Sequence, residues 1–190
     1  MIFDERPEDI SPAQNFFSVI SQTFTLLDQR ENQGAFTYLD EAYFCLEVVE
    51  NFNGIGGEIW RHLVHLRSIW VPPSSRRAGW MASTLELLLS YADACGVAID
   101  TVSNPFELSS MGKSIEDNRR IFLGDVGFRY LPNHQDKQHR QRKRLRKLGF
   151  RNVKMKSIGS RDRVRKKDCW IFIPSKFDKE LLSLIYKTDW

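Results

Sequence analysis

Hydrophobic and polar positions alternate along the chain with two periods, which together predict a fold containing both helices and strands. Apolar residues recur every three to four positions over residues 12–30, 80–94, 114–123 and 175–186, as is typical of amphipathic helices. Stretches rich in β-branched and aromatic residues predict strands at residues 35–40, 42–49, 59–71, 97–102, 151–157 and 169–174. This order predicts an α/β (α+β) class of fold, and 190 residues suit one domain over residues 1–190.

The ends of two helices are marked by local signals. Ser11, Pro12 and Gln14 form a capping-box pattern, which predicts a helix that begins at residue 12 and runs to about residue 30. Gly96 follows the helix at residues 80–94, in the position where a left-handed residue ends a helix. The helix at 114–123 lies in a segment that we interpret as an inserted helix and loop over residues 105–133.

Residues 66–95 combine a strand, a proline break, a basic turn and a helix. Pro72 and Pro73 end the strand because neither can donate to a β-ladder. Arg76, Arg77 and Gly79 then precede the helix. A helix N-terminus offers unpaired N–H groups and the positive end of its dipole. Two guanidinium groups and a glycine beside it suit a phosphate or pyrophosphate group.

This stretch resembles the acetyl-CoA-binding core of the GNAT superfamily of N-acetyltransferases. The signature of that family is Gln/Arg-x-x-Gly-x-Gly/Ala, between a strand and an amphipathic helix. Arg76 and Gly79 occupy its first two positions, and Met81 stands at the third. The resemblance covers residues 58–103, and more loosely residues 134–174. It implies a three-layer fold with a mixed, mostly antiparallel sheet that contains a splayed strand pair and is flanked by helices.

The resemblance implies acetyl-CoA as co-substrate, with no metal. Backbone groups of the strand would contact the pantetheine arm, and the turn with the first helical turn would hold the pyrophosphate. Asn104 would lie beside the acetyl group, although an Asn before Pro also suits a simple turn. The cofactor-binding candidates are Ile69, Val71, Arg76, Arg77, Ala78, Gly79, Trp80, Met81, Ala82 and Asn104.

The reaction that the resemblance implies is direct transfer of an acetyl group to an amine in a ternary complex. The acceptor would be an amine-bearing small molecule or protein, and it must lose a proton before it attacks the thioester. His65 falls where several members place a general base, and a His is suited to that role near neutral pH. Glu47 and Glu58 are weaker candidates for it.

The general acid of the family is a Tyr five residues before the Phe of a Gly-Phe ending, and this chain has Leu145 there. The alternative alignment places Leu123 at that position. The proton for the leaving thiolate would then come from Tyr130, a Cys or water. Met81 and Leu145 leave open the alternative that the chain is a non-catalytic module with this fold.

Charge is distributed unevenly. Residues 134–168 carry 15 Lys and Arg against 3 Asp, while the rest of the chain carries 13 basic and 21 acidic residues. This region, which includes the basic helix at 137–147, admits three interpretations: it binds nucleic acid or an acidic partner, it helps to hold the phosphates of CoA, or it is a solvated face.

The remaining composition points to an intracellular protein. No run of about 18 apolar residues is present, so no transmembrane helix is expected. The acidic N-terminus lacks the apolar segment of a signal peptide. Three scattered cysteines without metal-ligand spacing are typical of reduced thiols, and we therefore expect a cytoplasmic protein.

Overall fold

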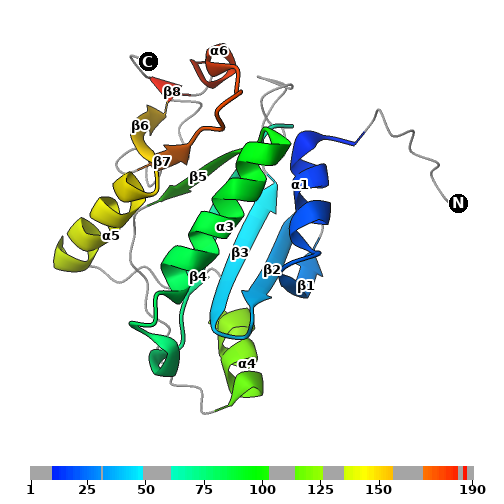
Figure 1. The fold of residues 1–190 in the computed structure, drawn as a ribbon, viewed down its shortest axis with the longest axis vertical. Helices are drawn as coiled ribbons and strands as arrows, with labels where there is room; N and C mark the ends of the chain where they lie inside the picture. Colours follow the sequence, from blue (N-terminus) through cyan, green and yellow to red (C-terminus); the bar gives the residue numbers. More distant parts are fainter. Residues whose placement is uncertain are drawn as a thin grey trace, which may run out of the picture.

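The computed structural model consists of one mixed β-sheet with helices on both faces (Figure 1). The structure describes residues 10–30, 32–48, 61–102, 114–125, 135–155, 169–183 and 186–187. Strands follow the spatial order β1-β2-β3-β4-β5-β7-β6-β8. Their bounds are β1 (Thr25–Arg30), β2 (Gln33–Tyr38), β3 (Ala42–Val48), β4 (Leu63–Trp70), β5 (Ala98–Val102), β6 (Arg151–Met155), β7 (Cys169–Phe172) and β8 (Tyr186–Lys187).

Four consecutive strands, β1 to β4, form an antiparallel meander. β4 and β5 are the parallel pair among the described strands, and the helix α3 (Trp80–Cys95) connects them. β7 then pairs antiparallel with both β5 and β6, so the later strand lies inside the sheet. The helix predicted at residues 80–94 and the strands predicted at 97–102, 151–157 and 169–174 are therefore confirmed.

The helices make two outer layers because strand side chains alternate between the faces. The first layer holds α1 (Pro12–Ile20), α3 and the end of α5 (Gln135–Lys147), with Phe16, Leu88 and Leu145 in one buried cluster. On the other face, Phe122 of α4 (Ile115–Asp125) and Leu182 of α6 (Lys179–Ser183) enter two separate clusters. Figure 1 shows α1 and α3 side by side over the sheet. The coarse expectation of a mixed sheet flanked by helices is confirmed.

The predicted first helix is correct at its start and wrong at its end. Both hydrogen bonds of the capping box are present, from Gln14 N–H to Ser11 Oγ and from Ser11 N–H to Gln14 Oε1. The helix nevertheless ends at Ile20, and the residues to Arg30 form the edge strand β1. Phe24 is buried at the turn between them. Pairing with β2, which local periodicity does not encode, decides the conformation of β1.

The C-terminal segment also differs from the prediction. One helix was expected over residues 175–186, but α6 covers five residues and Tyr186 begins the short strand β8, paired with β6. The long strand expected at 59–71 begins at Leu63, and its predicted first two residues lie outside the described residues. In the part of the chain that the structure describes, no helix has the length and apolar character needed to cross a membrane.

Candidate functional site

The basic turn before α3 has the geometry of an open helix N-terminus. Gly79 is the N-cap residue with φ +85°, and no side chain caps it. The first backbone bond of the helix runs from Ser83 N–H to the Gly79 carbonyl at 3.0 Å. The N–H groups of Trp80, Met81 and Ala82, which precede Ser83, belong to the set that a helix leaves without an internal partner. Arg76, Arg77, Ala78, Gly79 and Ala82 are exposed, so an anion can approach this turn.

The turn is held against the end of β4 and the β2–β3 hairpin. Arg76 donates from Nε to the Val71 carbonyl at 3.2 Å, which fixes its guanidinium group beside the strand end. The carbonyl of Val71 is thereby occupied. Ser75 donates to the Glu41 carboxylate, and the rings of Tyr38 and Trp80 meet edge to face at 6.0 Å. These contacts position the turn before any ligand binds.

β4 extends beyond its paired segment with β5, toward this turn. Paired residues run from Leu63 with Ala98 to Leu66 with Thr101, whereas β4 continues to Trp70. Thr101 Oγ1 donates to the Leu66 carbonyl at 2.9 Å, at the point where the pairing ends. Ile69 and Val71 therefore lie beyond the segment of β4 that pairs with β5, directly before the basic turn.

A third guanidinium group reaches the same helix end from α5. Arg144 Nη1 lies 3.7 Å from the Met81 sulfur in the first turn of α3. The side chain at the third signature position is thus a contact for an Arg of the basic helix. The sequence contained no signal for this contact because residues 81 and 144 are far apart in the chain.

On the opposite face of the sheet, His65 belongs to a buried polar triad. Its Nδ1 lies 2.7 Å from Asp100 Oδ1, and the Tyr186 hydroxyl donates to Asp100 Oδ2 at 3.0 Å. The side chains of His65 and Asp100 are 13% and 11% exposed. A carboxylate only accepts, so Nδ1 donates this hydrogen bond, and in the neutral tautomer of such a ring the lone pair is on Nε2. Burial, followed by the charge of Asp100, raises the pKa of Tyr186 well above its usual value.

His65 is also the centre of a polar row across the sheet. Its register partners are Glu47 on β3 and Asp100 on β5, and Gln33 on β2 pairs with Glu47. Glu47 Oε2 lies 3.4 Å from Arg67 Nη1, and its Oε1 accepts from Gln33 at 3.3 Å. Since both oxygens of Glu47 are engaged, His65 is the better placed of the two bases.

The predicted site residues thus fall into two described groups. The phosphate-site candidates from residue 76 to residue 82 lie together with Ile69 and Val71 around the end of β4, and His65 lies on the paired half of that strand. Leu145, at the position of the expected acid, is buried in the hydrophobic core. Asn104, Tyr130 and Glu58 lie outside the described residues.

Sequence reasoning missed Asp100 and Tyr186. Asp100 was visible as a lone carboxylate within the apolar strand VAIDTV, and a buried acid of this kind needs a partner. Tyr186 carried no such signal, because its position depends on how the C-terminal segment folds back onto β6. Among the described residues, no group of three or more His, Cys, Asp or Glu side chains is arranged to hold a metal ion.

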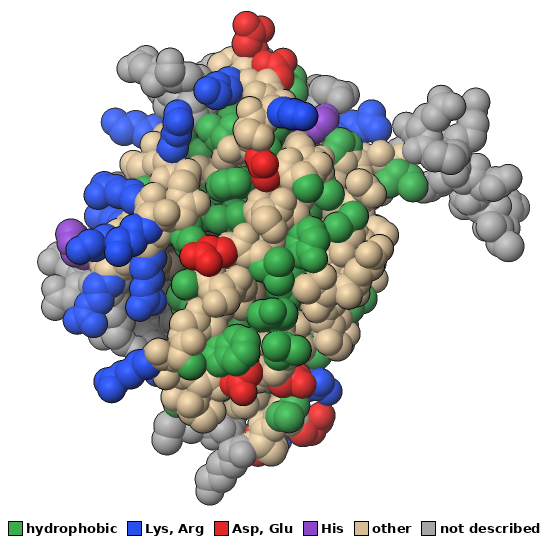
Figure 2. Space-filling model, in the orientation of Figure 1, with side chains coloured by type: hydrophobic (Ala, Val, Ile, Leu, Met, Phe, Trp, Pro, Cys, Tyr) green, Lys and Arg blue, Asp and Glu red, His purple; other side chains and the backbone are tan. Residues whose placement is uncertain are grey.

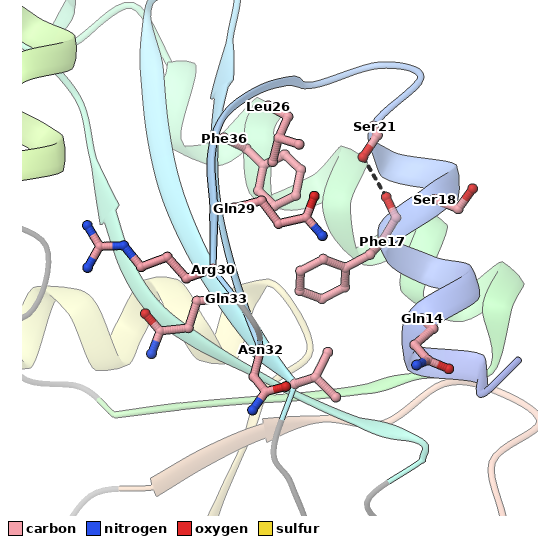
Figure 3. Close-up of a pocket in the computed structure, with 11 residues that line it drawn as sticks. Gln14, Phe17, Ser18, Ser21, Leu26, Gln29, Arg30, Asn32, Gln33 and Phe36 are labelled. Carbon is pink, nitrogen blue, oxygen red and sulfur yellow. Dashed lines mark hydrogen bonds between the residues drawn. The ribbon is translucent and has the colours of Figure 1, made fainter. Parts of the chain in front are cut away.

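A pocket of about 360 Å³ lies away from both groups, between α1 and the edge strand β1 (Figure 3). Phe17 points from α1 toward the strands, and Gln29 points from β1 into the same space. Its lining is Gln14, Phe17, Ser18, Ser21, Leu26, Gln29, Arg30, Asn32, Gln33, Phe36 and Val48. It contains none of the predicted site residues.

Comparison of the chain with protein-family models, curated proteins and solved structures finds no match.

Proposed function

We propose that this protein is an N-acetyltransferase of the GNAT type, which moves an acetyl group from acetyl-CoA to an amine. The observation that carries the proposal is the order of elements around α3: β4 pairs in parallel with β5 as far as Leu66 and leads into an exposed, glycine-capped N-terminus of α3 with two arginines. The strand order, with β7 between β5 and β6, also supports the three-layer fold that the family resemblance implies.

Binding follows from the two parts of the site. The N–H groups at the start of α3 and the side chain of Arg77 would hold the pyrophosphate, with Arg76 fixed beside them. Backbone groups of β4 beyond Leu66, on the edge away from β3, would bond the pantetheine arm in the manner of an added strand. The thioester of acetyl-CoA supplies the acyl carbon that the amine attacks.

His65 is the proposed general base. Asp100 accepts a hydrogen bond from Nδ1–H and so orients the ring, and Nε2 takes a proton from the amine as the amine nitrogen bonds to the acyl carbon. The carbon–sulfur bond breaks, and the thiolate leaves and takes a proton from water. Tyr186 positions Asp100 and does not itself contact the substrate. The acceptor is an amine-bearing small molecule or protein.

The test is acetyl-CoA binding measured by calorimetry. We expect wild-type protein to bind, and Arg76→Ala/Arg77→Ala to bind at least about tenfold more weakly, since each lost charge-assisted hydrogen bond contributes about 1.5–3 kcal/mol. Arg120→Ala/Lys176→Ala removes the same charge from exposed positions elsewhere and should bind like wild type. Absence of binding to millimolar acetyl-CoA would refute the proposal.

A second candidate function is a non-catalytic module of the same fold. Leu145 favours it, because a buried Leu cannot supply the proton that the family takes from a Tyr. Release of CoA thiol in the presence of an amine panel separates the two. Wild-type turnover that falls at least about tenfold in His65→Ala, with acetyl-CoA affinity unchanged, supports the enzyme. Binding without any thiol release supports the module.

We place the protein in the cytoplasm. Cys45 and Cys95 are free thiols, which suits a reducing compartment.

A further inference from the structure

The outer face of α5 carries a stripe of exposed cations. Arg140, Lys143, Arg144 and Lys147 follow the i, i+3, i+4, i+7 spacing of one helix face, and all four are exposed. We call these four residues the basic stripe. Leu145 on the other side of the helix is buried and fixes which face points outward. Figure 2 shows Lys and Arg side chains gathered along this side of the molecule.

The stripe continues onto neighbouring elements. Lys154 of β6 is exposed. It shares a face of the sheet with Asn152, whose register partner is Trp170. Trp170 belongs to the buried cluster that also contains Leu145 of α5, so Lys154 lies on the same face of the sheet as α5. At its other margin, Arg144 reaches the start of α3. The cationic surface therefore extends beyond a single helix.

The sequence around the stripe has a net positive charge. Residues 139–155 contain eight Lys and Arg and no Asp or Glu. Within the described part of the chain, Arg140, Lys143 and Lys147 form no ion pair, while Asp28, Asp40 and Glu47 pair with cations elsewhere. Like charges four residues apart weaken a helix by about 0.2–0.5 kcal/mol per pair, and a bound polyanion would remove that repulsion.

The surface has the wrong composition for a protein interface. Interface cores are rich in aromatic and apolar side chains and poor in Lys. The exposed large apolar residues of the described chain are Ile10, Leu26, Leu39 and Ile115, and none of them lies on α5 or β6. Contacts to phosphates need cations alone.

Single-stranded nucleic acid is also a poorer fit than a duplex. Proteins that bind single strands stack bases on accessible aromatic rings. Every aromatic side chain that the structure describes is buried or half-buried, and those near α5, such as Trp170, are in the core. We propose that the basic stripe with Lys154 binds the phosphate backbone of a nucleic-acid duplex without reading its bases.

The experiment measures the affinity of the full-length protein for 20-base-pair DNA and RNA duplexes at several salt concentrations. Contacts with four to five phosphates give a slope of log K against log salt of about −4. In Arg140→Gln/Lys143→Gln/Lys147→Gln we expect at least tenfold weaker binding and a slope shallower by about 3. Arg144 is left intact because it contacts α3.

The matched control is Arg120→Gln/Lys176→Gln/Lys179→Gln, which removes three exposed cations from α4 and the α6 region. It should bind duplexes within about twofold of wild type. Equal losses in both variants would mean that net charge alone is responsible and would overturn the proposal. Tighter binding to a poly-glutamate peptide than to either duplex would do the same, in favour of an acidic protein partner.

The outcome is independent of the proposed enzyme activity. The stripe variant should bind acetyl-CoA like wild type, and Arg76→Ala/Arg77→Ala should bind duplexes within about threefold of wild type, since one or two peripheral phosphate contacts change little. Failure of acetyl-CoA binding leaves the duplex inference standing, and absence of duplex binding leaves the enzyme proposal standing.

Discussion

At the scale of residues, the carboxylate of Asp100 is held by hydrogen bonds on both of its oxygens. Its carboxylate is buried in a strand, and His65 and Tyr186 occupy one oxygen each. A buried carboxylate without donors is strongly unfavourable. The same two hydrogen bonds therefore stabilise the fold and orient the proposed base.

We expect Tyr186→Phe to destabilise the protein by about 1–3 kcal/mol, because the substitution removes a donor and leaves a buried carboxylate oxygen unsatisfied. Denaturant unfolding measures the change. Tyr91→Phe is a matched control, since it removes a hydroxyl that bonds Thr23 at an exposed site, and it should cost less than about 1 kcal/mol. Equal costs would mean that Asp100 does not depend on Tyr186.

The buried thiol of Cys45 makes the free energy of unfolding decrease at alkaline pH. Burial raises the pKa of its thiol from 9.0 to about 11. Between these values the unfolded chain loses the proton and the folded chain keeps it, so stability falls as pH rises. This thiol alone should lower the free energy of unfolding by about 2–3 kcal/mol between pH 9 and pH 11.

Urea unfolding at pH 8, 9, 10 and 11 tests this prediction. The loss of stability should be smaller in Cys45→Ala than in wild type by that amount, because the constant packing cost of the substitution cancels in the pH difference. The tyrosine contributions, such as that of Tyr43, are common to both proteins. Parallel pH curves would show that the Cys45 thiol has an ordinary pKa.

Residue patterns predicted part of the candidate site and missed part of it. Gly79 and the two arginines were predictable because a glycine and cations before a helix form a local signal. His65 was singled out, but its partners were not, since Asp100 meets it through parallel pairing across a 35-residue separation. Arg144 at Met81 is non-local in the same way.

At the scale of elements, the packing of α1 on the sheet depends on one glycine. A Cβ atom on Gly34 would lie 2.6 Å from Phe36 Cε2 and 3.1 Å from the Phe17 ring. Phe36 is fully buried and stacks on Phe44 at 5.3 Å, so it has no room to yield. Gly34 thus lets the ring of Phe36 cover the strand and meet α1.

We expect Gly34→Ala to destabilise the protein by about 1–3 kcal/mol, the usual cost of overpacking a core. In the Phe36→Leu background the same substitution should cost about 1 kcal/mol less, since the smaller side chain leaves room for the methyl group. Thermal unfolding of the four proteins gives the coupling. Additive effects would contradict the steric explanation.

The elements that were predicted correctly have strong local signals. Ser11 and Gln14 make both bonds of the capping box, and Gly96 adopts φ +67° at the end of α3. β1 was mistaken for helix because Phe24 and Leu27 continue an apolar spacing of three and four, whereas pairing of the segment with β2 makes it a strand.

At the scale of the whole molecule, β7 packs in one hydrophobic core with elements from the first part of the chain. Trp170 of β7 is buried in the same cluster as Phe16 of α1, and Arg146 of α5 lies 5.4 Å from its ring. A substitution at Trp170 should therefore affect elements that are distant in sequence.

We expect Trp170→Ala to destabilise the protein by about 3–5 kcal/mol, through lost burial and the cavity that remains. Hydrogen exchange should increase in α1 and β2–β4 as well as in β7, because these elements share one core. Trp80→Ala, at a half-buried position, should cost less and leave exchange in β7 unchanged. Faster exchange confined to residues 169–172 would show that the sheet is not one cooperative unit.

Because β7 follows β6 in the chain but lies between β5 and β6, a nascent chain cannot complete its sheet during most of its synthesis. When residues 1–155 have left the ribosome, β5 still exposes the edge that Cys169–Phe172 will cover. An open, apolar strand edge of this kind invites pairing with other chains. We therefore expect this protein to need protection by chaperones until β7 emerges, and slowed translation between residues 155 and 169 to lower its soluble yield.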